Sequence, residues 1–393
     1  MKPAIIAFAP HRWQDRWLSR QHLLSRLAAM GWPVLYSFGP LSWWQRETPL
    51  WQQSSLLGSF AQQDGVVLDQ PGRFPPRWPG RPWWDQRVWD FHARRLQKRM
   101  AGRKILVFCF HPSFLPLVQR LAPSWLVYHV YDVFSLMESW TPQLASWEKA
   151  LVEEANLITT SSPAMAHHLP SPGPWKARLL DNGGDIEPVF ATANAPCPPD
   201  LAAIPHPRIG YAGTINAKVD LAMILHVARE RPQWHWVVLG PVLFSNQLAR
   251  DQSCAALWQE CLSLPNVHHL GNKPRQEVPA YLHHMDTLTI CYRVTAEDWV
   301  VHGYPVKFHE YLATGKPLVV APQSILKERF SHVTALATTP QEWLVCLGEA
   351  LAGVGVGDVN LRQQVARENG WQARAERLQE WLLEVVASPI GNH

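Results

Sequence analysis

The sequence predicts an α/β protein made of two domains in tandem, each built around a parallel β-sheet. The first observation is the length, since 393 residues exceed one ordinary domain and suggest two of about 150–200 residues each. The second is the alternation of short apolar runs with helical stretches, which is typical of parallel sheets with helical crossovers. The third is a Pro/Ala-rich stretch at 191–206, after which this alternation begins again.

Residues 1–190 are predicted to form the first domain. It opens with a βαβ unit, in which a buried strand at 4–10 and a strand at 33–38 flank a helix at 20–32. Further strands are expected at 104–110, 125–130 and 156–161, with an amphipathic helix around 147–154.

The stretch 191–206 is interpreted as an interdomain linker, and residues 207–370 as a second domain of similar size. Its strands are expected at 208–213, 234–240, 266–271, 287–292 and 317–320, with helices at 220–232 and 278–286. A helical stripe in 371–393 predicts a C-terminal helix that crosses back to pack on the first domain. The expected architecture is two Rossmann-like domains. Because no G-x-G-x-x-G follows a strand, a dinucleotide oxidoreductase is not indicated.

Composition limits the possible partners and compartments. A formal charge of +4 is small for this length and does not indicate wholesale nucleic-acid binding. The six cysteines form no C-x-x-C pair, which favours a reducing, cytoplasmic setting. The apolar run before His11 is too short for a signal peptide, and no uncharged run reaches the roughly 18 residues of a membrane span. We therefore expect a soluble or at most peripheral protein.

The segment Gly303–Pro322 reads as a short helix followed by a buried strand. Pro305 suits the first helical turn and Gly315 the C-terminal stop. Lys307 and Glu310 lie one turn apart near the N-terminal end, where free N–H groups favour phosphate. A carboxylate next to such a site can accept hydrogen bonds from the vicinal hydroxyls of a ribose. The alternative is an ordinary surface ion pair between the two side chains.

Several motifs together resemble the GT-B glycosyltransferases, in particular the bacterial group that uses nucleotide sugars with retention. The segment around Lys307 is similar to their donor-site motif. The other matching stretches are RIGYAGTINAKVDLAMILHVARERPQWHWVVLGPV, LPNVHHLGNKPRQEVPAYLHHMDTLTICY and NLITTSSPAMAHHL…ARLLDNGGDIEPVF. The resemblance implies two Rossmann-like domains facing each other across a cleft, and a reaction that needs neither a metal ion nor a cofactor besides the nucleotide-diphosphate sugar.

The resemblance also implies roles for individual residues. Lys307 would contact the donor diphosphate and Glu310 the ribose hydroxyls. Gly213 and Thr214 would let the backbone approach the phosphates, with Lys218 as a second basic contact. The nucleotide base would lie against Gly240 and Pro241. Tight turns between strand and helix are the alternative explanation for both glycines.

One position departs from the family pattern. Many members carry a second glutamate eight residues before Glu310, where it touches the sugar, and this chain has His302 there. Glu297 and Asp298 lie nearby at other spacings, so the contacts to the sugar hydroxyls are expected to differ.

Three residues of the first domain are candidates for the reaction centre. Asp132 follows the strand at 125–130, at the sheet edge where α/β proteins bind ligands, and family members often have a histidine or aspartate facing the sugar there. His129 is a second candidate on the same strand. His11 follows the first strand, beside Arg12 and Asp15. A helix N-cap for Asp132, and caps or salt bridges for the others, are the alternatives.

The segment 73–104 is basic and rich in tryptophan, with ten Lys/Arg, two Asp and a net charge of +8. Interleaved aromatic and basic residues suit a membrane interface or an anionic glycan, and a lipid-linked acceptor would account for both. A helix with a solvated basic face is the alternative. Single-stranded nucleic acid fits less well, because there is only one such patch.

These observations predict a glycosyltransferase that moves a sugar from a nucleotide donor to a cell-envelope, lipid-linked or exopolysaccharide acceptor. It would work in the cytoplasm or at the inner face of the plasma membrane. A nucleotide-sugar epimerase of the same fold is one alternative. A non-catalytic protein that binds nucleotides or glycans is another, favoured by the missing upstream glutamate.

Overall fold

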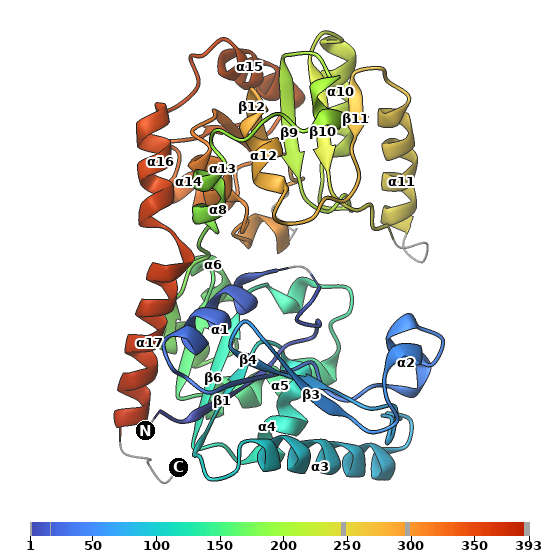
Figure 1. Ribbon diagram of the computed structural model, residues 1–393, viewed down its shortest axis with the longest axis vertical. Coiled ribbons are helices and arrows are strands. Elements are labelled where there is room, and N and C mark those ends of the chain that lie inside the picture. Colours follow the sequence, from blue (N-terminus) through green and yellow to red (C-terminus); the bar gives the residue numbers. More distant parts are fainter. Residues whose placement is uncertain (1, 16, 245–248, 295–298, 389–393) are drawn as a thin grey trace. The chain divides into compact units, whose positions relative to one another are not determined.

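The computed structural model describes residues 2–15, 17–244, 249–294 and 299–388. The chain forms two compact units, Met1–Asp181 with Trp371–His393, and Asn182–Gly370 (Figure 1). The sequence suggested a boundary near 190 and a linker at 191–206. In the structure, the second unit begins at Asn182, and the stretch 191–206 belongs to it and contains a short helix, Pro199–Ala202.

The first unit is built on an eight-stranded sheet within the described residues, ordered β3-β4-β2-β1-β5-β6-β7-β8. The pairs are parallel except β3 with β4, an antiparallel hairpin that the sequence analysis did not predict. The strands are β1 Ala4–Phe8, β2 Val34–Ser37, β3 Ser59–Gln63, β4 Val66–Gln70, β5 Ile105–Cys109, β6 Trp125–Val130, β7 Leu157–Thr160 and β8 Ala177–Leu179.

Helices pack around this sheet (Figure 1). They are α1 Ser19–Ala29, η1 Trp43–Gln45, α2 Pro49–Gln53, α3 Pro82–Arg99, η2 Pro112–Phe114, α4 Leu115–Leu121, η3 Phe134–Leu136, α5 Pro142–Glu154, α6 Pro163–His167, α7 Gly173–Lys176 and α17 Trp371–Ala387. Every residue of β1 is buried, as expected for a central parallel strand covered on both faces.

The C-terminal helix α17 belongs to the first unit and lies against α1 (Figure 1). The Trp371 ring stacks on His22 with the ring centroids 4.9 Å apart. Arg374 Nε lies 2.9 Å from Asp181 Oδ1, and both side chains are buried. Breaking a buried ion pair of this kind costs several kcal/mol, roughly 3–5, so this contact fixes the returning helix.

The second unit is built on a six-stranded parallel sheet within the described residues, ordered β11-β10-β9-β12-β13-β14. The strands are β9 Arg208–Ala212, β10 His235–Leu239, β11 Val267–His269, β12 Thr287–Ile290, β13 Leu318–Val320 and β14 Ala335–Leu336. The helices are α8 Ile186–Ala191, α9 Pro199–Ala202, α10 Leu221–Glu230, α11 Ala249–Leu262, α12 Val278–His283, η4 Trp299–His302, α13 Phe308–Ala313, α14 Ser324–Arg329, α15 Pro340–Leu351 and α16 Val359–Glu368.

The helix of the Gly303–Pro322 segment, α13, begins later than the sequence suggested. Pro305 lies in a preceding turn, closed by a hydrogen bond of 3.1 Å from Phe308 N to its carbonyl. The backbone is held there because the carbonyl of Tyr304 accepts a hydrogen bond from Asn182 Nδ2. Lys307 is therefore the N-cap residue and not part of the helix. The helix ends as predicted at Gly315, which has a left-handed φ of +74°.

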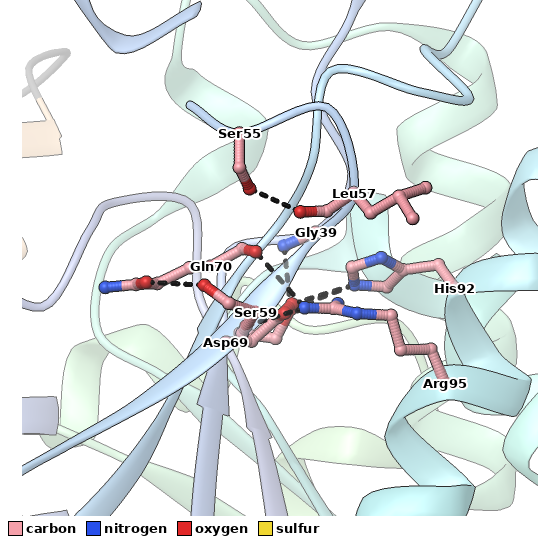
Figure 2. A network of polar contacts seen from close by, with 9 residues as sticks. Gly39, Ser55, Leu57, Ser59, Asp69, Gln70, His92 and Arg95 are labelled. Atoms are coloured by element: carbon pink, nitrogen blue, oxygen red, sulfur yellow. Dashed lines mark hydrogen bonds and ion pairs between the residues drawn. The ribbon is translucent and has the colours of Figure 1, made fainter. Parts of the chain in front are cut away.

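A buried polar cluster, the Asp69 network, attaches α3 to the sheet of the first unit (Figure 2). Asp69 Oδ2 accepts a hydrogen bond of 2.6 Å from Ser37 Oγ and lies 3.0 Å from His92 Nε2, while Arg95 pairs with Oδ1. Although Ser, His and Asp meet here, the serine donates directly to the carboxylate and not through the histidine, so this is no nucleophile relay. The network is structural and connects β2, β4 and α3.

Among the described residues, no helix combines the length and the apolar character that crossing a membrane requires.

Candidate donor site

Two glycine loops meet at the carboxyl-terminal edge of the second sheet. Gly213 follows β9 and donates a hydrogen bond of 2.8 Å to the carbonyl of Leu239, the last residue of β10. A Cβ on Gly240 would lie only 2.2 Å from the carbonyl oxygen of Gly213. Ile215 N donates 2.9 Å to the carbonyl of Pro241, which joins the two loops further. Gly240 is therefore required for the close approach of the two backbones.

Lys307 reaches across to the first of these loops. A Cβ on Gly213 would lie 2.1 Å from Lys307 Nζ, so the ammonium group occupies the space that glycine leaves. The same nitrogen lies 4.1 Å from the centre of the Tyr211 ring, on β9. A lysine placed just before α13 thus brings its charge to the end of β9.

A second lysine shares an aromatic ring with the first. Lys218 Nζ lies 5.0 Å, and Lys307 Nζ 5.6 Å, from the centre of the Tyr292 ring. The loop of Lys218 is fixed because its carbonyl accepts a hydrogen bond of 2.8 Å from Arg293 N. Within the described part of the chain, neither ammonium group forms an ion pair with a carboxylate. We call Lys218, Lys307 and Tyr292 the two-lysine site.

The charges in this site perturb each other. Burial lowers the pKa of Lys307, and the neighbouring Lys218 charge lowers it further. Burial raises the pKa of the Tyr292 hydroxyl, but the charges of Lys218 and Lys307 outweigh it and the net pKa is lowered. The site therefore holds more positive charge than its own side chains neutralise, which is the electrostatic condition for binding an anion.

Glu310 lies on α13, beside the loop that opens the second unit. A Cβ on Gly184 would lie 3.2 Å from Glu310 N, so this loop passes over the start of the helix. The next residue, Asp185, forms an ion pair with Arg275. Burial, followed by the Asp185 charge, raises the pKa of Glu310 to about 7. Glu310 forms no ion pair with Lys307, so the alternative of a simple surface pair does not describe this helix.

The structure places Gly213, Thr214, Lys218, Gly240, Pro241 and Lys307 around the same edge of the sheet. Thr214 is buried, and its carbonyl accepts a hydrogen bond of 3.1 Å from the Tyr211 hydroxyl. His302 ends η4, and its side chain lies outside the described residues, as do Glu297 and Asp298.

Sequence reasoning missed the aromatic part of this site. Tyr211 and Tyr292 both occur at strand ends, in RIGYAG and TLTICY. Their position at the carboxyl-terminal edge was a usable signal, but tyrosine in such a run reads first as a core residue.

The three candidates of the first unit have different environments. His129 is buried on β6, where its Nδ1 lies 2.8 Å from Thr159 Oγ1. Burial and then the Arg20 charge lower its pKa to about 3, so the ring is neutral. Asp132 is half-buried and caps no helix, since η3 begins at Phe134 with Val133 as its N-cap.

His11 lies exposed in the loop after β1, and its carbonyl accepts a hydrogen bond of 2.6 Å from Tyr36 Oη. Its neighbours Arg12 and Asp15 form an exposed ion pair of 3.3 Å. This is the salt bridge that the sequence offered as the alternative role for these two residues. His11 follows β1 and Asp132 follows β6, and β5 lies between these two parallel strands. Both residues therefore lie at the carboxyl-terminal edge of the first sheet.

Among the described residues, no group of three or more His, Cys, Asp or Glu side chains is arranged to hold a metal ion.

Comparison with known proteins gave one match in sequence and many in structure. No family model matches the chain. The curated relative, "Putative teichuronic acid biosynthesis glycosyltransferase TuaH" of Bacillus subtilis, is 24% identical over 298 residues, covering 71% of this chain and 72% of that protein. Sucrose-phosphate synthase of Thermosynechococcus elongatus superposes with a TM-score of 0.73 at 14% identity, over 98% of this chain and 100% of the other. The chain has the GT-B glycosyltransferase fold.

Two further structures support this conclusion. A UDP-forming trehalose-phosphate synthase of Burkholderia xenovorans gives a TM-score of 0.70 at 12% identity, over 99% of this chain and 100% of that one. HepE of Anabaena in complex with UDP-glucose gives 0.67 at 15% identity, over 97% and 100% of the two chains. The predicted fold class and the predicted resemblance to the GT-B glycosyltransferases are confirmed.

Proposed function

We propose that this glycosyltransferase moves a sugar from a nucleotide-diphosphate donor to a cell-envelope acceptor, with retention and without a metal ion. The observation that carries the proposal is the two-lysine site, where two ammonium groups share one aromatic ring and have no carboxylate partner among the described residues. An anion with two or more charges is the complementary ligand. The diphosphate of a nucleotide sugar has this charge, and it gains a further charge as the sugar leaves.

Each residue then has a role. Lys307 and Lys218 bind the diphosphate and stabilise the negative charge that develops on the leaving group. A Cβ at position 213 would lie 2.1 Å from Lys307 Nζ. A side chain there would therefore take the space beside the ammonium group that a phosphate needs. Glu310, when ionised, accepts hydrogen bonds from the ribose hydroxyls. Gly240 and Pro241 border the base, and His302 takes the position of the upstream glutamate.

The uracil base is the first choice for the donor. HepE was solved with UDP, with UDP and glucose, and with UDP-glucose, and the trehalose-phosphate synthase is UDP-forming. The sugar would react on the face that retains its configuration, with Asp132 as the polar residue of the first unit nearest the chemistry. His11 and His129 are second candidates, and His129, being buried and neutral, suits a hydrogen bond to the sugar better than proton transfer.

For the acceptor we propose a glycan or lipid-linked glycan at the inner face of the plasma membrane. The name of TuaH refers to teichuronic acid biosynthesis, which supports a cell-envelope product. The first unit also exposes large apolar side chains, including Trp44 (63%), Trp83 (56%) and Phe74 (53%). Arg87 lies 5.5 Å from the Trp83 ring, and this mixture of cations and exposed aromatics suits an anionic membrane surface.

The four tryptophans of segment 73–104 differ in exposure. Trp78 and Trp83 are exposed and Trp84 is half-buried. Trp89 is buried beneath Arg77, whose guanidinium lies 4.1 Å from its ring. Trp83→Ser should therefore weaken binding to vesicles with anionic lipid in a sedimentation assay, and the folded content should not change. Equal binding of wild type and variant would contradict membrane contact through this surface.

The donor proposal is tested by calorimetry with UDP, GDP, ADP and dTDP in the absence of divalent metal. We expect one nucleotide, UDP, to bind, and Glu310→Ala to weaken it by about 1–3 kcal/mol through loss of hydrogen bonds to a charged group. Glu187→Ala, on α8, is the control. Absence of binding for all four nucleotides would contradict the proposal. Nucleotide binding with sustained turnover in the absence of an acceptor would favour an epimerase.

A further inference from the structure

The first unit contains a fully buried arginine without a hydrogen-bond partner. Arg20 is the second residue of α1, and its side chain has no exposed surface. Within the described part of the chain, no acceptor lies in hydrogen-bond geometry around its Nε, Nη1 and Nη2 atoms, although its charge acts on the nearby hydroxyls of Tyr36 and Tyr131 and opposes the rise in pKa that burial causes there. Leaving a buried charge unpaired costs several kcal/mol, so such a group is rarely kept for stability alone.

Two tyrosines lie near this guanidinium. Its centre lies 5.2 Å from the middle of the Tyr131 ring, just after β6. Tyr36, on β2, lies near enough for the Arg20 charge to act on it, and its hydroxyl donates to the carbonyl of His11. The Arg20 charge also acts on His111, whose pKa falls to about 4 through burial and the charges of His11 and Arg20. Two carboxylates lie near enough for their charges to act on these tyrosines, Asp15 on Tyr36 and Asp132 on Tyr131, but among the described residues neither is a hydrogen-bond partner of the guanidinium.

A second buried polar atom of the same cluster also lacks a partner. His129 is completely buried, and its Nε2 atom has no hydrogen-bond partner in the described structure. When Nδ1 accepts a hydrogen bond from the Thr159 hydroxyl, 2.8 Å away, Nε2 carries the proton and is a donor. The Arg20 charge acts on the His129 ring, so the donors of a guanidinium and an imidazole N–H lie in one region of the first unit, without an acceptor among the described residues.

We propose that Arg20 and His129 form a binding site for an oxyanion, the phosphoryl or carboxylate group of a substrate. A planar guanidinium matches two oxygens of such a group at once, and the imidazole N–H can bind a third. The half-buried Tyr131 ring lies beside the guanidinium, so a ligand would approach Arg20 past this ring. The ligand belongs to the acceptor, an assignment that rests on the proposed function, whereas the anion site itself does not.

The test uses the full chain and inorganic phosphate as the probe, with potassium chloride at equal ionic strength as the reference. Thermal unfolding is followed for wild type, Arg20→Met, Lys307→Met and Arg26→Met, the last a control on the same helix. Because phosphate can also bind at the two-lysine site, Arg20→Met and Arg26→Met are also made in the Lys307→Met background. Phosphate should raise the Tm of wild type, Lys307→Met and Arg26→Met/Lys307→Met, but not that of Arg20→Met/Lys307→Met. Without phosphate, Arg20→Met should be at least as stable as wild type, because an apolar side chain replaces an unpaired charge.

A phosphate-dependent rise in Tm that is as large in Arg20→Met/Lys307→Met as in Lys307→Met would overturn the proposal. If that variant does not fold, Arg20→Lys keeps the charge but loses the planar fork. It should weaken phosphate roughly ten- to a hundredfold by calorimetry. Unchanged affinity in Arg20→Lys would count against the site.

Calorimetry with UDP then separates the two sources of the anion. Unchanged UDP affinity in Arg20→Met assigns the oxyanion to the acceptor. A parallel loss of phosphate and UDP binding would support the site but assign it to the donor diphosphate. If UDP does not bind to wild type while the phosphate effect on Tm depends on Arg20, the proposed function fails and the anion site stands.

Discussion

Two clusters of charged side chains, one in each unit, show how differently proteins use similar groups. In the Asp69 network, the carboxylate is buried, its Oδ1 pairs with Arg95 and its Oδ2 lies 3.0 Å from His92 Nε2. In the two-lysine site, the ammonium groups of Lys218 and Lys307 face one tyrosine ring without a carboxylate partner among the described residues. The first contains Ser, His and Asp and looks like a catalytic triad, but its charges are balanced. The second has the excess charge that a ligand can balance.

The comparison predicts that the first cluster controls stability and the second controls affinity. The largest effect is expected for Asp69→Asn, which leaves His92 and Arg95 without their anion. Its unfolding free energy should fall by about 3–5 kcal/mol, measured by urea denaturation, while UDP affinity at 20 °C stays unchanged. Asp286→Asn, at an exposed ion pair with His206, is the control and should cost much less.

The pH dependence of the Asp69 network has a definite sign. Burial raises the pKa of Asp69, but His92, Arg95 and Ser37 outweigh this and hold it below its usual value. Its stabilising contribution is therefore present above the ordinary carboxyl range and is lost as the pH falls through the lowered pKa. A variant Asp69→Asn with wild-type acid stability would contradict this role.

A smaller effect is expected at the glycine loops of the donor site. Gly240→Ala would place a Cβ 2.2 Å from a backbone oxygen, and the loops must separate. We expect a loss of about 1–3 kcal/mol in stability together with weaker UDP binding. Gly102→Ala, which has a left-handed φ of +80° but open space around it, is the control for backbone strain. Equal stability losses and unchanged UDP affinity in both variants would argue against close loop contact at the site.

The next prediction concerns Glu310, whose pKa of about 7 results from burial and from Asp185. Only the ionised form accepts two hydrogen bonds from a ribose diol. Affinity for uridine, which does not ionise in this range, should therefore rise about tenfold per pH unit up to pH 7 and level off above it. Glu310→Gln should remove this dependence. In the free protein, the raised pKa makes the Glu310 contribution to stability fall as the pH rises toward 7.

The sequence allowed the fold to be predicted because local patterns determine most of it. The strand at 125–130 has the predicted bounds, and Gly315 ends its helix where expected. The structure divides the chain after Asp181, and the side chain of Asn182 donates a hydrogen bond to the Tyr304 carbonyl, a long-range contact that no local pattern predicts. The same contact delays α13, so that Pro305 lies in a turn.

Single motifs predicted individual residues of the site, but they did not predict which of these residues are in contact. The contacts of Lys307 with Gly213 and Tyr292 join segments that are far apart in the sequence. The periodicity of a single segment does not show that Tyr292 lies near both Lys218 and Lys307. For the same reason, the unpartnered guanidinium of Arg20 could not be predicted, because it depends on what every neighbouring element leaves unpaired.

The most direct test of the central claim is to compare UDP and uridine by calorimetry, for wild type, Lys307→Ala, Lys218→Ala and the control Lys327→Ala. If the two lysines bind the diphosphate, both variants should lose about 1.5–3 kcal/mol of UDP affinity and none of their uridine affinity, and the control should match wild type. Equal losses for UDP and uridine, or no loss for UDP, would contradict the two-lysine site as the diphosphate-binding site.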